Sequence, residues 1–134
     1  MFFFSYNWGV QEEVKSVQNL IEKLGFEDFF FDIRNLNIGD ELEPRLKSAI
    51  NSSKVVLLFL TPEYLKSKNC NLELIEAFEN GKPKIVPIIM KQCQNNDWPS
   101  GIEKYKEKIS SKLYADFSKI LINDLSIKIN LLRN

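Results

Sequence analysis

The side chains of this sequence that could do chemistry are carboxylates, hydroxyls, amides and two thiols, because the chain contains no histidine. This absence excludes an imidazole general base, a Ser-His-Asp triad and any histidine-ligated metal site. The two cysteines, Cys70 and Cys93, lie far apart and form no CxxC pair, which argues against a zinc site. Carboxylates and hydroxyls are therefore the groups to consider first.

Composition narrows the class of protein. The chain has 134 residues, 44% hydrophobic and 27% charged, as expected of one globular domain spanning residues 1–134. Lys and Arg total 18, as do Asp and Glu, so the net charge is zero. A balanced charge gives no electrostatic reason to expect nucleic acid or acidic lipid as a partner, and it permits self-association.

The chain is expected to be cytoplasmic. Two unpaired thiols in a small domain fit a reducing compartment. The apolar start, residues 1–6, is too short for a signal peptide, and no apolar run approaches the ~20 residues that span a bilayer. A strand starting at residue 2 also suggests a domain cut from a longer protein.

Strand and helix patterns alternate along the chain, which predicts a parallel sheet with right-handed crossovers. The continuous apolar run at residues 54–60 predicts a central strand, and Pro87 suggests an edge position or a bulge. The expected strands are residues 2–4, 28–31, 54–60, 85–89 and 112–117. Helices are expected at residues 11–24, 41–50 and 118–132, with a short one near 101–108. A helical turn is also expected after residue 61, and a further helix is expected to begin at a cap formed by Asn71.

The candidate site follows from this order of elements. In open α/β sheets, ligands bind beyond the carboxyl ends of the strands. Three polar segments are predicted to emerge at that edge: Ser5 to Gly9, Asp32 to Asp40, and Thr61 to Glu73.

Four sequence motifs follow one another in order along the whole chain. They are Phe3-Phe4-Ser5-Tyr6; Phe29-Phe30-Phe31-Asp32 followed by Leu36 and Gly39; Val55 to Leu60 followed by Thr61-Pro62, Tyr64, Ser67 and Cys70-Asn71-Leu72-Glu73; and Ile85-Val86-Pro87-Ile88. Together these motifs resemble those of the TIR (Toll/interleukin-1 receptor) domain family. The resemblance implies a flavodoxin-like three-layer sandwich, a five-stranded parallel sheet with helices on both faces.

The resemblance implies a reaction and a catalytic residue. Many TIR domains cleave NAD⁺ at the nicotinamide–ribose bond, and the residue that matches their catalytic glutamate is Glu73. Loss of nicotinamide builds oxocarbenium-like charge on the ribose, which a carboxylate stabilises. NAD⁺ would be the substrate, with no cofactor and no metal. Without the resemblance, Glu73 would be a solvated carboxylate in the first turn of a helix.

The loop Asp32 to Asp40 has no proline before its glycine, so it resembles the loops of NAD-cleaving members. Its simplest alternative is a plain turn in which Gly39 supplies a positive φ. The same loop is the usual self-assembly surface of the family. The residues expected at assembly contacts are Arg34, Asn35, Asn37, Ile38 and Trp98.

Eight further residues are predicted to line the substrate site: Ser5, Tyr6, Trp8, Asp32, Leu36, Gly39, Thr61 and Cys70. Structural alternatives exist for several of them. Trp8 could pack on the first helix, Thr61 could start a helix, Cys70 could be a small buried hydrophobe, and Trp98 could cap the core.

Two functions remain open. The first is an NAD⁺ glycohydrolase, with cyclisation and base exchange as further reactions of the same site, activated by assembly with other TIR domains in immune or cell-death signalling. The second is a non-catalytic signalling adaptor that works through TIR–TIR contacts. A receiver-type domain is disfavoured, because it would need clustered acids after the first strand, where Ser5-Tyr6-Asn7 stands.

Overall fold

The computed structural model of the chain describes residues 1–31, 44–80, 83–111 and 115–116. Within them a parallel sheet has the strand order β2-β1-β3-β4-β5. Its body is four strands of three to six residues: β1 (Phe2–Ser5), β2 (Phe29–Phe31), β3 (Val55–Leu60) and β4 (Lys84–Ile89). At one edge, the two-residue β5 (Ala115–Asp116) pairs with the end of β4.

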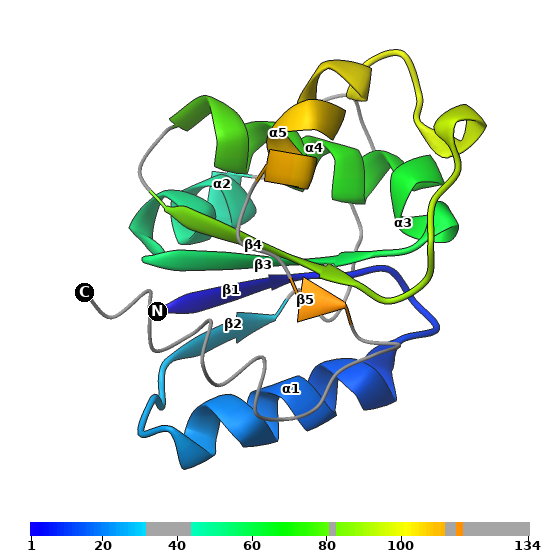
Figure 1. The fold of residues 1–134 in the computed structure, drawn as a ribbon. Coiled ribbons are helices and arrows are strands. Elements are labelled where there is room, and N and C mark those ends of the chain that lie inside the picture. The colour runs from blue at the N-terminus through cyan, green and yellow to red at the C-terminus, as the bar shows by residue number, and fades with distance from the viewer. Residues whose placement is uncertain (32–43, 81–82, 112–114, 117–134) are drawn as a thin grey trace.

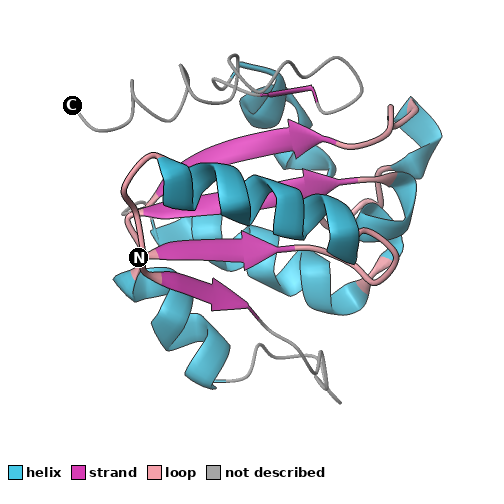
Figure 2. Ribbon diagram, turned by 90° about the horizontal axis from the view of Figure 1, so that it is seen from below, coloured by secondary structure: helices cyan, strands magenta, loops and turns pink. Residues whose placement is uncertain are grey.

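Helices cover both faces of the sheet, as predicted (Figures 1 and 2). On one face lies α1 (Gln11–Lys23). On the other lie α2 (Pro44–Ser52), α3 (Pro62–Lys66), α4 (Lys68–Asn80) and α5 (Lys106–Ser111), with the 3₁₀ turns η1 (Asn95–Asp97) and η2 (Glu103–Tyr105). None of the described helices is long and apolar enough to cross a membrane.

Strand alternation divides the core into two layers, because successive side chains of a strand point to opposite faces. All six residues of β3 are buried, which confirms the predicted central strand. The layer under α2 and α4 holds Phe3, Val56, Leu58 and Leu60 among others. The layer over α1 holds Phe2, Phe4, Val55, Leu57 and Phe59 among others.

Some predicted boundaries were wrong. Asn71 does not cap α4, which already begins at Lys68. Ser67 takes the capping role that was expected of Asn71, because its Oγ accepts a hydrogen bond from the backbone N–H of Cys70 at 3.3 Å.

Pro87 pairs in register with Leu58 of β3, so it does not lie in a bulge. Its strand β4 is not the last strand of the sheet, although Pro87 itself lies in an edge-like position. On its other side, β4 is paired with β5 only at Ile88 and Ile89, so among the described residues Pro87 has one strand neighbour. A missing N–H is tolerated at such a position. Residues 41–43, 112–114 and 117–132 of other predicted elements lie outside the described residues.

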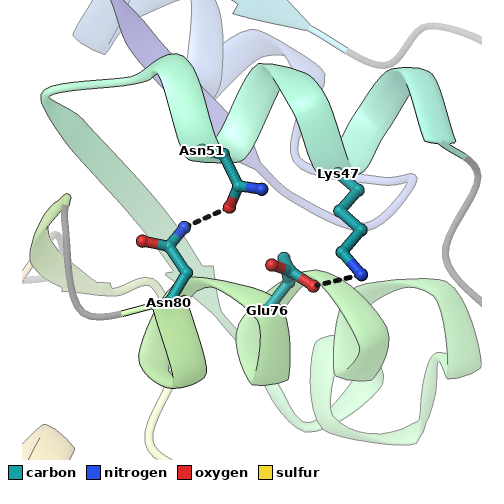
Figure 3. A network of polar contacts seen from close by, with 4 residues as sticks. All are labelled: Lys47, Asn51, Glu76 and Asn80. Atoms are coloured by element: carbon teal, nitrogen blue, oxygen red, sulfur yellow. Dashed lines mark hydrogen bonds and ion pairs between the residues drawn. The ribbon is translucent and has the colours of Figure 1, made fainter.

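Polar contacts join α2 to α4 at the surface (Figure 3). Lys47 Nζ lies 3.9 Å from Glu76 Oε1, and Asn80 donates from Nδ2 to Asn51 Oδ1. Lys47 and Asn51 are four residues apart on α2, and their partners Glu76 and Asn80 are four residues apart on α4. The later residue of one helix pairs with the later residue of the other, so the two helices run in the same direction. Beneath them, Leu46 is 1% exposed.

Loss of the buried Leu46 side chain should lower stability far more than loss of the Lys47–Glu76 ion pair at the surface. We expect Leu46→Ala to lower the free energy of unfolding by about 2–5 kcal/mol, because it opens a cavity in the core. Glu76→Gln should cost at most about 1 kcal/mol, because the Lys47 side chain is largely exposed and solvent screens the pair. Urea unfolding of both variants measures this, and equal losses would contradict the layer assignment.

Candidate functional site

Three elements bring two hydroxyls and a carboxylate together at the carboxyl end of β1. Ser5 is the last residue of β1, and alternation turns it to the same face as Phe3, toward α4. Tyr64 lies on α3, which follows directly after β3. Glu73 lies in the second turn of α4. The predicted meeting of the first and third polar segments is therefore present.

These groups form a buried hydrogen-bonded network. The Ser5 hydroxyl donates to Glu73 Oε1 at 2.6 Å, and Ser5 Oγ lies 2.7 Å from the Tyr64 hydroxyl. Ser5 and Tyr64 are both 0% exposed and Glu73 is 3% exposed. The expectation of a solvated first-turn carboxylate was therefore wrong: Glu73 is interior and one turn further along its helix.

The number of hydroxyl protons determines which group donates in each hydrogen bond of the network. Each hydroxyl has one proton to donate. Because Ser5 donates to an ionised Glu73, Tyr64 must donate to Ser5. If Glu73 carried a proton, the order could reverse, since the Tyr64 hydroxyl also lies 3.3 Å from the carbonyl oxygen of Cys70. The geometry thus accommodates Glu73 in either protonation state.

Burial also fixes the state of the tyrosine. The pKa of the Tyr64 phenol is raised well above its ordinary value, chiefly by burial, with smaller electrostatic contributions from Cys70 and Glu73. The hydrogen bond with Ser5 opposes this rise in pKa only in part. Tyr64 therefore remains a neutral phenol that can donate a hydrogen bond at physiological pH.

Thr61 and Cys70 support this network from the backbone side. Thr61 is the N-cap of α3, and its Oγ1 accepts from the backbone N–H of Tyr64 at 2.9 Å, so its expected role as a helix start is confirmed. Cys70 is 0% exposed and packs in the core layer under α4. Its place in that core agrees with the expectation of a small buried hydrophobe.

Tyr6 and Trp8 lie away from the network. Tyr6 packs in the layer over α1, with its ring centroid 6.4 Å from that of Phe59. It also lines an open pocket of about 190 Å³ beside α1. Trp8 is 63% exposed, in the turn before α1, and Gly9 beside it has φ +106°. The structure does not bring these two aromatic residues to Glu73.

The remaining predicted residues divide into two groups. Trp98 is partly buried against the core under α4, and it also lines a second pocket, so it does cap the core as one alternative held. The rest of the predicted substrate and assembly residues lie outside the described residues: Asp32, Arg34, Asn35, Leu36, Asn37, Ile38 and Gly39.

Tyr64 is the site residue that sequence reasoning missed as a member of the network. A signal was available: Tyr64 follows the strongest strand, and a buried tyrosine usually pairs its hydroxyl. Among the described residues, no group of three or more His, Cys, Asp or Glu side chains could hold a metal ion. The chemistry that the arrangement offers is that of a carboxylate held by the Ser5 hydroxyl, which in turn bonds to the Tyr64 hydroxyl.

Comparisons with known proteins agree with this fold. The TIR domain of the Toll-related receptor TRR-2 from Hydra magnipapillata superimposes with a TM-score of 0.71 at 18% identity, covering 99% of this chain and 98% of that chain. The TIR domains of the activated Roq1 resistosome, which directly recognises the pathogen effector XopQ, give a TM-score of 0.65 at 16% identity, with 98% and 96% covered. No curated protein is a significant match in sequence.

The family itself is identified by sequence. The TIR domain model matches residues 2–126, which is nearly the whole chain and includes every strand of the sheet. This chain belongs to the TIR domain family.

Proposed function

We propose that this TIR domain is an NAD⁺ glycohydrolase with Glu73 as its catalytic carboxylate, activated by self-assembly in immune or cell-death signalling. The observation that carries the proposal is the hydrogen bond from Ser5 to Glu73. It holds a carboxylate at the carboxyl end of β1, the edge of an open α/β sheet where ligands bind.

A carboxylate suits the proposed reaction. Breaking the nicotinamide–ribose bond leaves positive charge on the ribose, and an oriented carboxylate stabilises it. Nicotinamide leaves from an already cationic ring, so no general acid is needed at that bond. Ser5 and Tyr64 would hold Glu73 in position while the charge develops.

The burial of Glu73 explains why assembly would be required. At 3% exposure, the carboxylate lies beneath the surface of a single copy and cannot reach a ribose. A contact with a neighbouring copy that uncovers Glu73 would therefore switch the reaction on. In this account NAD⁺ and other TIR domains are the partners, and the single domain is the resting state.

The same burial favours a second candidate, a non-catalytic adaptor that signals through TIR–TIR contacts. In that case Glu73, Ser5 and Tyr64 form a purely structural network that fixes α3 and α4 against β1. The two candidates differ in one measurable property, the release of nicotinamide.

Replacing the carboxylate separates the two candidates. We expect concentrated protein to release nicotinamide from NAD⁺, with an activity per molecule that rises with protein concentration. Glu73→Gln should lower that activity by about a hundredfold or more, because the charge that stabilises the ribose is lost. Chromatographic measurement of nicotinamide follows the reaction.

Glu76→Gln is the matched control, since Glu76 lies nearly one turn further along α4 and pairs with Lys47. It should leave turnover unchanged. No turnover by an oligomer verified by light scattering would rule out the enzyme and leave the adaptor. Full turnover by Glu73→Gln would instead remove Glu73 from the mechanism.

Ser5 should matter for both folding and turnover. Ser5→Ala removes the donor to a buried carboxylate, which should cost about 1–3 kcal/mol of unfolding free energy. If Ser5 also orients Glu73, turnover by the folded fraction should fall at least about tenfold. Ser48→Ala on the surface of α2 is the control for both measurements. A stability loss without any loss of turnover would limit Ser5 to a structural role.

A further inference from the structure

A second pocket lies at the carboxyl ends of β3 and β4, apart from the network of Ser5, Tyr64 and Glu73. Its volume is about 220 Å³. The last residues of both strands, Leu60 and Ile89, line it from the sheet. Among the described residues, its other lining residues come from the segment after β4 and from α5: Gln92, Cys93, Trp98, Lys106 and Ile109.

The volume of the pocket limits the size of its ligand. An engineered cavity of about 150 Å³ binds benzene, whereas pockets for drug-sized ligands begin near 300 Å³. A space of 220 Å³ therefore suits one aromatic ring with a short substituent and is too small for a dinucleotide.

The walls of the pocket define the ligand's chemistry. Leu60 and Ile109 are buried, and with Ile89 and the Trp98 indole they form apolar walls that suit a flat ring. Gln92 supplies an amide that can donate and accept, and Lys106 supplies an ammonium whose Nζ donates to Asn95 Oδ1.

The described charges around the pocket are of both signs, with two carboxylates against one ammonium. The Lys106 ammonium lines it, while the carboxylates of Asp97 and Glu63 lie close enough to act on the Cys93 thiol. An anionic substituent would meet both signs of charge, whereas a neutral carboxamide can accept from Lys106 and donate to an acid or to Gln92.

We propose that this pocket is a binding site for a small neutral aromatic carboxamide, with its ring against Trp98 and its amide toward Lys106 and Gln92. The site is distinct from that of the proposed reaction, and its occupancy does not require the chain to be an enzyme. Benzamide is the probe, because nicotinamide would also engage the proposed reaction site.

Cys93 gives a chemical reporter of occupancy. Burial, with Asp97 and Glu63, raises the pKa of Cys93 to about 11, so the thiol is protonated at neutral pH. Alkylation by iodoacetamide should therefore quicken about tenfold per pH unit from pH 8 to pH 10, since only the thiolate reacts. Cys70, at 0% exposure, should stay unmodified in the native chain, and mass spectrometry of tryptic peptides distinguishes the two. Saturating benzamide should slow Cys93 alkylation at least fivefold.

Fluorescence gives the affinity directly. The chain has two tryptophans, so Trp8→Phe leaves Trp98 as the sole indole. Benzamide should change its emission saturably, with a Kd of roughly 0.1–5 mM as expected for so small a ligand. Benzoate and cyclohexanecarboxamide should bind at least fivefold more weakly, since one carries a charge and the other lacks a flat ring.

Substitutions of lining residues test whether benzamide binds in this pocket. Ile109→Phe fills it and should weaken benzamide at least tenfold, and Lys106→Met should weaken it several-fold. Lys108→Met is the matched control, because Lys108 is exposed, and its Nζ lies 5.6 Å from the ring centroid of Tyr105. If Ile109→Phe fails to fold by circular dichroism, Gln92→Ala at an exposed position takes its place, with a several-fold weakening expected.

The results have distinct meanings. Saturable binding that protects Cys93 and weakens in the pocket variants, but not in Lys108→Met, supports the site. Binding unchanged in those variants, or an unsaturable response, overturns it. Benzoate binding as tightly as benzamide overturns the assignment of a neutral amide. None of these results depends on nicotinamide release, so the proposed reaction can fail while this site stands.

Discussion

A carboxylate within the layer between the sheet and α4 is the constraint on which the rest of the site depends. An isolated buried charge costs far more than one domain's stability, and hydrogen bonds to it recover part of that cost. Ser5 provides that compensation by donating to Glu73, and Tyr64 supports it by bonding to Ser5. The register of β1 is therefore fixed both by its buried apolar side chains and by this hydrogen bond. A slip of one residue would turn Ser5 to the other face of the sheet and leave the carboxylate without its donor.

Much of this fold could be predicted from patterns that are local in the sequence. The six apolar residues of β3 predict a central strand because only a strand covered on both faces is apolar throughout. Thr61 before Pro62 predicts a helix start, and the hydroxyl of Thr61 does cap α3. These features are encoded within a few neighbouring residues, so a reader of the sequence alone can find them.

The candidate site was predicted only in part, because its contacts are not local. Glu73 and Ser5 were both named, yet their hydrogen bond joins residues 68 positions apart, and the bond to Tyr64 spans 59. The alternative of a solvated Glu73 was wrong for a further reason. Asn71 is as good a cap residue as Ser67, and a cap at Asn71 would place Glu73 in the first turn, whereas α4 begins at Lys68 and Glu73 shares its buried face with Cys70 and Ala77.

Whether Glu73 serves a reaction or only the fold depends on how firmly α3, which carries Tyr64 of the network, is held in place. This helix has five residues, too few to be stable alone. It is held by the Thr61 cap, by the bond between Tyr64 and Ser5, and by burial of Tyr64 and Leu65. Breaking the bond to Ser5 would keep every strand pairing of the sheet, but Tyr64 would still be held by its burial and by its contact with the carbonyl oxygen of Cys70. Displacing α3 would also expose Leu65, so any partner that opens this network must replace the lost apolar contacts with its own.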